Sequence, residues 1–420
     1  MKDMFKYDFR RWVEFLLSIF IFTFLILPKL SNLIIFCLII FVFIGYVKKN
    51  IYFSFNNLNY LFIAFYFCYL IGSLWTNHPS VALGYLEKKL SLLVFPLLFS
   101  FKLKEGKLSL RLPILAFVFG LIFLTIEGLF ASFNCFFSNG SKLCFSASTL
   151  SSIHHPTYFS VFLFFSMGLV WYGYKSNFRF FNFPLVITYL IFAFLVQSSL
   201  MSLAGVLYLY FFLSVLLFIY LIKKFNKILI LLLFIVGITI TFSSVKYIPY
   251  LRDEIGQSQE AFKNYIKNPV KYIKSRVYPL SGNDTRLAMW ETSFLVFEEH
   301  IFGVGTGNVD DYLASRLNHF GQTELAKQNY NPHNQFLQIA VEIGIIGLLF
   351  FLILLGGLLK FAFKNKNYLI LILVTSLIFN SLFESMLQRH SGIVFYFFWI
   401  TLIITQFKKS DIILNDSDII

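Results

Sequence analysis

Long apolar runs alternate with short polar links along most of this chain. The runs are close to the roughly 20 residues that a helix needs to cross the hydrocarbon core of a bilayer. The pattern predicts twelve membrane-spanning helices, over residues 12–29, 31–48, 58–76, 81–102, 111–133, 156–174, 184–199, 201–222, 228–247, 335–361, 367–384 and 391–407. We therefore expect an all-α fold and a polytopic integral membrane protein.

One long polar interval interrupts this pattern and divides the chain into three parts. Residues 1–247 carry nine predicted spans, residues 248–334 form the polar interval, and residues 335–420 carry three spans and a short tail. The interval is too long for a simple connection, so we expect it to have structure of its own.

Helical spacing within the polar interval predicts short surface helices. Asn283 or Asp284 is suited to cap a helix that runs to about His300, and a second helix is expected over 309–318. Between them, the three glycines of 303–307 predict a turn, because no preceding strand or following Lys-Ser/Thr makes them a nucleotide-binding loop.

Composition and charge agree with a membrane protein. The 420 residues are 58% hydrophobic and only 13% charged, with a net charge of +14, whereas soluble domains carry about 25% charged residues. Alternate links are basic, as the positive-inside rule requires of cytoplasmic links. They contain Lys48, Lys49, Lys102, Lys104, Lys107, Arg111, Lys175, Arg179, Lys223, Lys224, Lys227, Lys360, Lys364, Lys366, Lys408 and Lys409.

This charge distribution predicts which partners the protein binds and how it is oriented in the membrane. The basic residues face membrane lipids, and no nucleic acid partner is expected. Both termini are predicted to be cytoplasmic, and the polar interval is predicted to lie on the outer face, which is the periplasm of a Gram-negative cell.

Two parts of the polar interval carry candidate chemistry. Arg286 and Trp290 are four residues apart and share a helix face, and a guanidinium beside an aromatic ring suits a diphosphate. The alternative is a surface arginine on an amphipathic helix that rests on lipid headgroups. His333 follows the helix-breaking Asn331-Pro332 and is a candidate general base at the membrane boundary; the alternative is an ordinary interfacial histidine.

These residues, taken together, resemble the O-antigen ligase and polymerase superfamily of bacterial membrane glycosyltransferases. The similar features are His333-Asn334 followed by Gly344 and Gly347, Arg286-x-x-x-Trp290, the glycine run 302–307, His155-Pro-Thr-Tyr158 and Pro96. Gly344 and Gly347 are expected to allow the close approach of another helix.

The resemblance implies transfer of a glycan from an undecaprenyl-diphosphate carrier at the outer face of the inner membrane. The acceptor is a lipid A–core sugar in a ligase and a carrier-linked repeat unit in a polymerase. The chemistry implied is inverting, without metal or other cofactor. Arg286 would hold the diphosphate, His333 would orient or deprotonate the acceptor hydroxyl, and Asn334 and Gln335 would support it.

One position departs from the family pattern. Leu200 stands where related proteins carry a second arginine. Either another outer cation substitutes for it (Arg276, Arg389 or Lys274), or diphosphate binding is weaker, or the protein has a different activity. Glu384 and Arg389 flank the eleventh span on the outer side and are further site candidates.

Several remaining polar residues have two interpretations. His155 is a candidate substrate-binding residue, although His154 and His155 also fit an interfacial pair. Glu87, Lys88 and Lys89 fall inside the fourth apolar run, where charge is costly, and either pair with one another or line a cavity. Cys135 and Cys144 bracket an outer link and are a possible disulfide.

Alternatives of other kinds remain at this point. A transporter of lipid-linked glycans fits twelve spans equally well, but it usually has internal repeats and paired broken spans, and the sequence has no convincing repeat. A purely structural membrane protein leaves the His333 pattern unexplained. Ligase, polymerase and protein O-oligosaccharyltransferase are not separated by these motifs.

Overall fold

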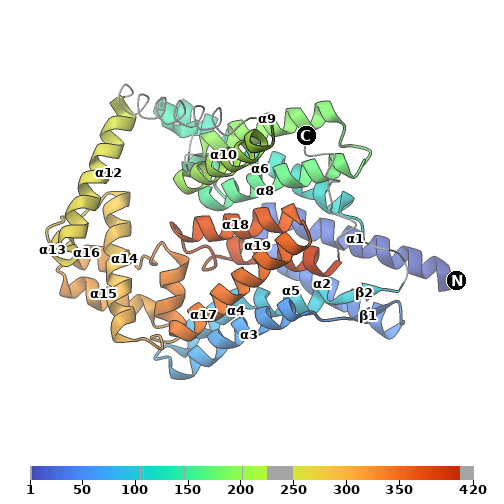
Figure 1. The fold of residues 1–420 in the computed structure, drawn as a ribbon, viewed down its shortest axis with the longest axis horizontal. Helices are drawn as coiled ribbons and strands as arrows, with labels where there is room; N and C mark the ends of the chain where they lie inside the picture. Colours follow the sequence, from blue (N-terminus) through green and yellow to red (C-terminus); the bar gives the residue numbers. More distant parts are fainter. Residues whose placement is uncertain are drawn as a thin grey trace.

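The computed structural model describes residues 2–104, 106, 108–145, 147–200, 202–224 and 249–406. Helices dominate the fold (Figure 1). The predicted ninth span, 228–247, lies outside the described residues.

The N-terminal helices follow the predicted spans closely. They are α1 (Lys2–Ile26), α2 (Pro28–Val47) and α3 (Asn57–Gly72), the last followed by a 3-10 turn, η1 (Ser73–Trp75). Pro28 begins α2 at the first helical position, where its missing N–H costs nothing. The side chain of Asn56 caps α3 by accepting a hydrogen bond from the Asn59 N–H.

The predicted single span over 81–102 is wrong, because the chain forms two helices there. They are α4 (Pro79–Lys89) and α5 (Ser91–Phe99), and they meet at Leu90. The interruption comes directly after the charged residues 87–89. Lys89 is 1% exposed and lies 3.7 Å from the carboxylate of Glu342, so this charge turns to a protein partner rather than facing lipid.

The prediction of an entirely helical fold is also wrong, because the structure contains one pair of short strands. Strands β1 (Ile51–Phe53) and β2 (Phe101–Leu103) pair antiparallel, with Ile51 opposite Leu103. The Gln406 amide fixes the start of β2 by donating to the carbonyl groups of Phe99 and Phe101. β2 was hidden at the end of the predicted span 81–102, and β1 lies in the link between the predicted spans 31–48 and 58–76.

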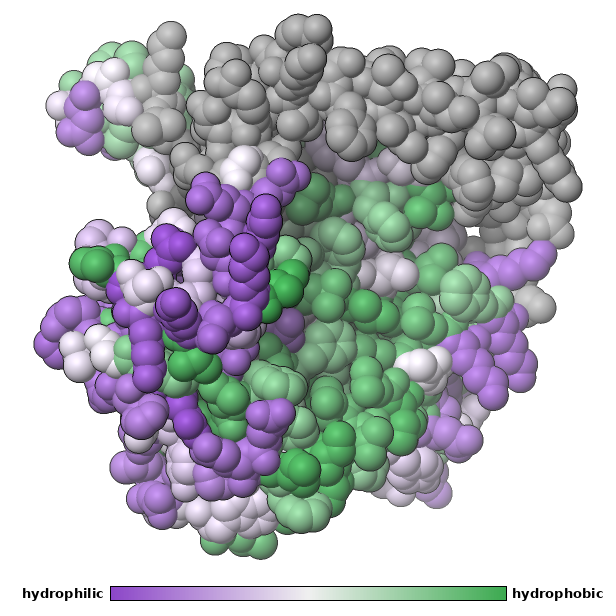
Figure 2. Space-filling model, turned by 60° about the vertical axis from the view of Figure 1, so that its left-hand side comes forward, coloured by the Kyte–Doolittle hydropathy of each residue, from purple (hydrophilic) through white to green (hydrophobic). Residues whose placement is uncertain are grey.

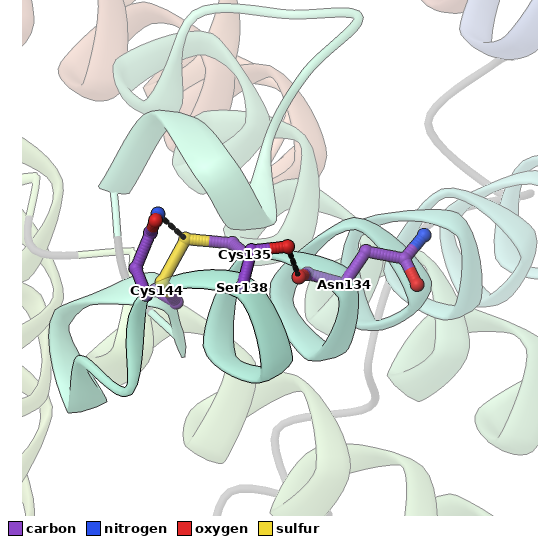
Figure 3. Close-up of a disulfide and its surroundings, with 5 residues drawn as sticks. Asn134, Cys135, Ser138 and Cys144 are labelled. Carbon is purple, nitrogen blue, oxygen red and sulfur yellow. Dashed lines mark hydrogen bonds between the residues drawn. A yellow bond between two sulfur atoms is a disulfide. The ribbon is translucent and has the colours of Figure 1, made fainter.

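A disulfide ties down the link after the next long helix. This helix, α6 (Arg111–Asn139), is followed by the 3-10 turn η2 (Lys142–Phe145) and by α7 (Ala147–Leu150). Cys135 on α6 is bonded to Cys144 on η2, and the Asn139 amide lies 3.7 Å from the Cys135 sulfur (Figure 3). The link therefore folds back along the end of α6.

The remaining apolar helices build the body of the molecule. They are α8 (Pro156–Lys175), α9 (Phe183–Ser199), α10 (Leu203–Lys224), α17 (Gln335–Lys364), α18 (Tyr368–Ser381) and α19 (His390–Gln406). α19 is buried along nearly its whole length, from Gly392 to Thr405. A helix that is apolar on all sides belongs in such a central position, and it packs against α5 and α18.

The polar interval forms its own helical layer at one end of the molecule. Its helices are α12 (Pro249–Lys267), α13 (Pro269–Lys274), α14 (Gly282–Glu299), α15 (Val309–His319) and α16 (Thr323–Ala326). They enclose a second apolar core that includes Met289, Leu313 and Leu325 and that reaches Val341 of α17. The helix expected to end near His300 is present, but its cap is Ser281, whose hydroxyl accepts from the Asp284 N–H (3.1 Å), rather than Asn283 or Asp284.

The surface of the molecule is that of a polytopic membrane protein. Pro28–Val47, Asn57–Trp75, Arg111–Asn139 and Gln335–Lys364 are long and apolar enough to cross a membrane, and three shorter apolar helices accompany them in the described part of the chain. A broad apolar surface lies between the polar helical layer and a second polar region (Figure 2). The N-terminus and the β1–β2 pair lie at the end opposite to α12–α16 (Figure 1).

Candidate active site

Helix α17, which begins next to His333, is interrupted after its first two turns. Ile343 and Gly344 leave the helical conformation, with φ of −126° and +70°, so 335–342 and 345–364 are two helical halves. The close approach predicted for Gly344 is present, but its partner is the turn at Phe302 and not a neighbouring helix. Gly344 also supplies a positive φ, which residues with a side chain rarely adopt.

The glycine run 303–307 satisfies the backbone groups that this break releases. Val304 N–H donates to the Val341 carbonyl (2.8 Å) and Gly305 N–H donates to the Glu342 carbonyl (3.0 Å). Gly303, Gly305 and Gly307 all have positive φ, as the predicted turn requires. The two glycine motifs of the sequence thus form one structural unit, which joins the polar layer to α17.

His333 immediately precedes Asn334, the cap of α17, and its side chain contacts a carboxylate. Its Nδ1 is 3.3 Å from Glu384 Oε2, and the exposed fractions of the two side chains are 21% and 9%. The His333 backbone N–H donates to the Asn331 side chain (2.9 Å), and the Tyr330 ring lies 5.9 Å from the imidazole. The imidazole is therefore fixed in orientation but remains partly exposed.

The environment of Glu384 favours its charged form. Burial opposes ionisation, but the hydrogen bond from His333 and the positive charges of His333, His155 and Arg389 hold the pKa of Glu384 below its ordinary value. A carboxylate only accepts hydrogen bonds, so Nδ1 of His333 must carry the proton. Nε2 is then the ring nitrogen that remains for an acceptor hydroxyl.

Arg286 and Trp290 approach this pair from α14. The Trp290 indole N–H lies 3.5 Å from the His333 carbonyl oxygen, at the outer limit of a hydrogen bond. Arg286 is one turn earlier on the helix and within electrostatic range of His155. Within the described residues no carboxylate is paired with Arg286, and its buried Nε has no hydrogen-bond partner.

His155 and Arg389 complete the cluster. His155 caps α8, where its side chain accepts from the Thr157 N–H. Burial lowers the pKa of His155; the charge of Glu384 offsets this in part, while the charges of Arg389, His333 and Arg286 add to it. Arg389 is exposed, and its charge acts on both His155 and Glu384.

Asn334 and Gln335 hold the backbone around the site. Asn334 caps α17 by accepting from the N–H groups of Phe336 and Leu337, and its amide donates to the Leu382 carbonyl (3.2 Å). Gln335 is fully buried and accepts from the Leu387 N–H (2.6 Å). Both side chains thus join α17 to the segment that carries Glu384 and Arg389.

The other candidate cations have different surroundings. Arg276 lies 4.0 Å from Asp284 and its guanidinium sits over the Tyr272 ring at 4.2 Å. Lys274, on α13, is exposed. Leu200 is fully buried at the end of α9. Of the three possible replacements for the missing family arginine, Arg389 is the one that the structure brings into the electrostatic field of His155 and Glu384.

His154 has a structural role rather than a place in the cluster. Its Nε2 is 2.8 Å from the Leu25 carbonyl oxygen and its Nδ1 is 2.9 Å from the Ser391 hydroxyl, so it joins α1 to α19. The described residues contain no group of three or more His, Cys, Asp and Glu side chains that is arranged to hold a metal ion.

Sequence reasoning missed a buried polar cluster directly beneath the site. Glu342 on α17 and Gln388 share a hydrogen bond (2.8 Å), and Lys89 contacts both. The available signal was an acidic residue inside an apolar span, which is costly and therefore functional by default. Lys89 was recognised in this way, but Glu342 was not.

The arrangement defines a class of site. An imidazole and the carboxylate that orients it lie at one end of an apolar helix bundle, and Arg389 and Arg286 both act electrostatically on the neighbouring His155. This combination suits the transfer of a group between an anionic leaving group and a hydroxyl acceptor.

The comparison with known families agrees with this class. Residues 185–352 match the family model for the O-antigen ligase domain (Wzy_C), so the resemblance found in the sequence is confirmed for this segment. Family members are membrane glycosyltransferases of the ligase and polymerase type. The matched segment includes Arg286, Trp290 and His333, but not Glu384 or Arg389. No curated protein matches the chain.

Proposed function

We propose that the protein is an O-antigen ligase-like glycosyltransferase. It moves a glycan from an undecaprenyl-diphosphate carrier to a sugar of lipid A–core at the outer face of the bacterial inner membrane. The observation that carries this proposal is the His333–Glu384 contact of 3.3 Å beside Arg286, in a chain with an O-antigen ligase domain.

The proposed reaction is a single displacement. The acceptor hydroxyl oxygen attacks the anomeric carbon of the donor glycan, and its proton passes to Nε2 of His333. The bond between that carbon and the diphosphate oxygen breaks, and the electron pair leaves with undecaprenyl diphosphate. One displacement inverts the anomeric centre, and no metal or other cofactor is assigned a step.

Each side chain of the cluster has a stated role. Glu384 orients His333 and stabilises the imidazolium that forms when the base takes the proton. Arg286 and Arg389 neutralise the charge that develops on the leaving diphosphate. Trp290, Asn334 and Gln335 keep the His333 backbone in place, and His155 adds a polar group to the wall.

The proposed topology has twelve spans with cytoplasmic termini and places residues 248–334 in the periplasm. The basic links support this orientation. So does the Cys135–Cys144 disulfide, which suits an oxidising compartment.

Deletion of the gene tests the function and separates the close alternatives. Loss of all long chains from lipid A–core, with polymer accumulating on the carrier, is the expected result. Core bearing a single repeat unit indicates the polymerase instead. Intact surface polysaccharide with loss of glycan from proteins indicates a protein O-oligosaccharyltransferase. Unfinished glycan confined to the cytoplasmic leaflet indicates a transporter.

Complementation of the deletion strain places the activity in the site. Arg286→Ala is expected to leave the strain without long chains, whereas Arg316→Ala is expected to restore them. Arg316 is a matched control because it lies in the same polar layer, paired with Glu299. Restoration of the wild-type gel pattern by Arg286→Ala would remove that residue from the mechanism.

A further inference from the structure

The segment that carries Glu384 and Arg389 has no regular secondary structure, yet most of it is buried. This segment, residues 382–389, joins α18 to α19. Ser385, Met386 and Leu387 are each at most 1% exposed. Irregular backbone at such depth persists only where the surrounding protein satisfies its polar groups. The elements that hold residues 382–389 therefore also determine where Glu384 lies.

One face of the outer half of α17 provides much of this support. Gln335, Gln338 and Glu342 are spaced three and four residues apart and share that face. The Gln335 side chain accepts a hydrogen bond from the Leu387 N–H (2.6 Å). Glu342 Oε2 accepts from the amides of Gln388 (2.8 Å) and of Gln338 (3.2 Å).

Lys89 completes the support from the opposite side. Its ammonium group donates to Gln388 Oε1 (3.0 Å) and lies 3.7 Å from Glu342 Oε1. The Gln388 side chain is thus held at both ends, with its oxygen on the cation and its amide on the carboxylate. Lys89 and Glu342 are each 1% exposed.

Stability alone is a weak reason for such a buried pair. Burying two charges costs several kcal/mol in desolvation, and apolar replacements of similar volume are often as stable. In some proteins buried ionic groups are retained because they fix one arrangement of the chain. Here the arrangement that they fix is the segment that meets His333.

We propose that Lys89, Glu342 and Gln388 are positioning residues of the transfer site. They hold residues 382–389 so that the Glu384 carboxylate stays on His333 Nδ1. This inference rests on the function proposed above. It assigns an effect on the rate of transfer to three buried residues that take no direct part in the reaction.

A double-mutant cycle on the reconstituted full-length protein tests the proposal. Glycan transfer is measured with the undecaprenyl-diphosphate-linked donor and lipid A–core for wild type, Gln388→Leu, Glu384→Gln and the combination. Gln388→Leu is expected to lower kcat about 10-fold while KM for the donor changes less than about 2-fold, because the substitution disturbs geometry rather than binding. In the Glu384→Gln background it is expected to have less than about a 2-fold effect, because its influence passes through Glu384.

A control variant and a replacement variant pair accompany this experiment. Asn59→Leu removes another buried amide, which bonds Pro96 and Ser100 instead, and is expected to keep wild-type kcat in both backgrounds. If Gln388→Leu does not reach the membrane, the charge-conserving pair Lys89→Met with Glu342→Gln is judged by the same criteria.

Two results overturn the inference. One is a wild-type kcat in the Gln388→Leu protein, and the other is a full additional loss in the Glu384→Gln background. Either result leaves the proposed function intact as long as His333→Ala abolishes transfer. Retention of transfer by His333→Ala overturns the function itself.

Discussion

At the scale of single residues, His333 has a backbone conformation that few side-chain-bearing residues adopt. Its φ is +49°, in the left-handed region. The Asn331 side chain and the Trp290 indole hold the backbone on either side of the imidazole. Strain of this kind persists where the surroundings over-determine it, and it clusters at functional sites. We interpret it as the cost of keeping the imidazole against Glu384.

The pKa of Glu384 leads to a prediction about pH. Because the pKa is lowered in the folded protein, ionised Glu384 stabilises the fold above the ordinary value of about 4.3, and this contribution is lost as pH falls through the lowered pKa. Thermal unfolding in detergent should therefore show Glu384→Gln below wild type at neutral pH. The two curves should converge in acid.

Glu324→Gln is the control for this comparison. Glu324 belongs to an exposed pair with Lys327, and such surface pairs contribute little to stability. Its unfolding midpoint should follow that of wild type throughout. A Glu384→Gln difference that persists unchanged into acid would show that the carboxylate is not charged in the native site.

At the scale of elements, α17 connects the polar layer to the membrane bundle. Its break at Gly344 receives the backbone of Phe302 and Gly303 so closely that a Cβ on Gly344 would lie 2.2 Å from the Phe302 carbonyl carbon. The clash involves backbone atoms, which cannot rotate away. The two glycine motifs are therefore expected to tolerate no side chain at this contact.

Gly344→Ala tests the contact, with Gly356→Ala as its matched control on the same helix. Gly344→Ala should lower stability by more than about 1 kcal/mol, because the positive φ and the close backbone both exclude a methyl group. A Cβ on Gly356 meets nothing within 4 Å, so Gly356→Ala should be neutral or slightly stabilising. Equal unfolding midpoints for the two variants would contradict this description of the break.

The elements show where sequence reasoning succeeds and where it stops. Hydrophobic runs gave the boundaries of α2, α8 and α9 within a few residues, because lipid imposes a simple length rule. The same rule failed over 81–102, where Lys89 has a buried partner that is 253 positions away in sequence at Glu342. Hydrophobic periodicity indicates which faces of a helix are apolar, but it does not identify a partner that is distant in sequence.

At the scale of the whole molecule, the site is assembled from distant parts of the chain. Arg286 and His333 lie within the polar layer, whereas Glu384 and His155 come from the ends of helices in the bundle. The sequence identified each residue separately: Arg286 by its spacing to Trp290, and His333, Glu384 and His155 by their positions at the ends of predicted spans. Their convergence follows from packing, which the order of spans alone does not determine.

The orientation of the molecule gives a labelling prediction. In a background with Cys37→Ser and Cys68→Ser, a membrane-impermeant maleimide should label Ser315→Cys on α15 when only the outer membrane is permeabilised. Lys104→Cys, in the basic link after β2, should be labelled only after the inner membrane is opened. Both positions are exposed, so accessibility within the protein does not decide the result. The reverse pattern would invert the topology.

The most direct measurement for the central claim is glycan transfer by the reconstituted protein with and without the imidazole. Release of undecaprenyl diphosphate is counted against glycan joined to lipid A–core for wild type, His333→Ala and, as a control, His319→Ala on the exposed face of α15. The account predicts that His333→Ala lowers the rate at least about 100-fold, as removal of a general base does, while His319→Ala stays within about 2-fold of wild type. Transfer at the wild-type rate by His333→Ala would contradict it.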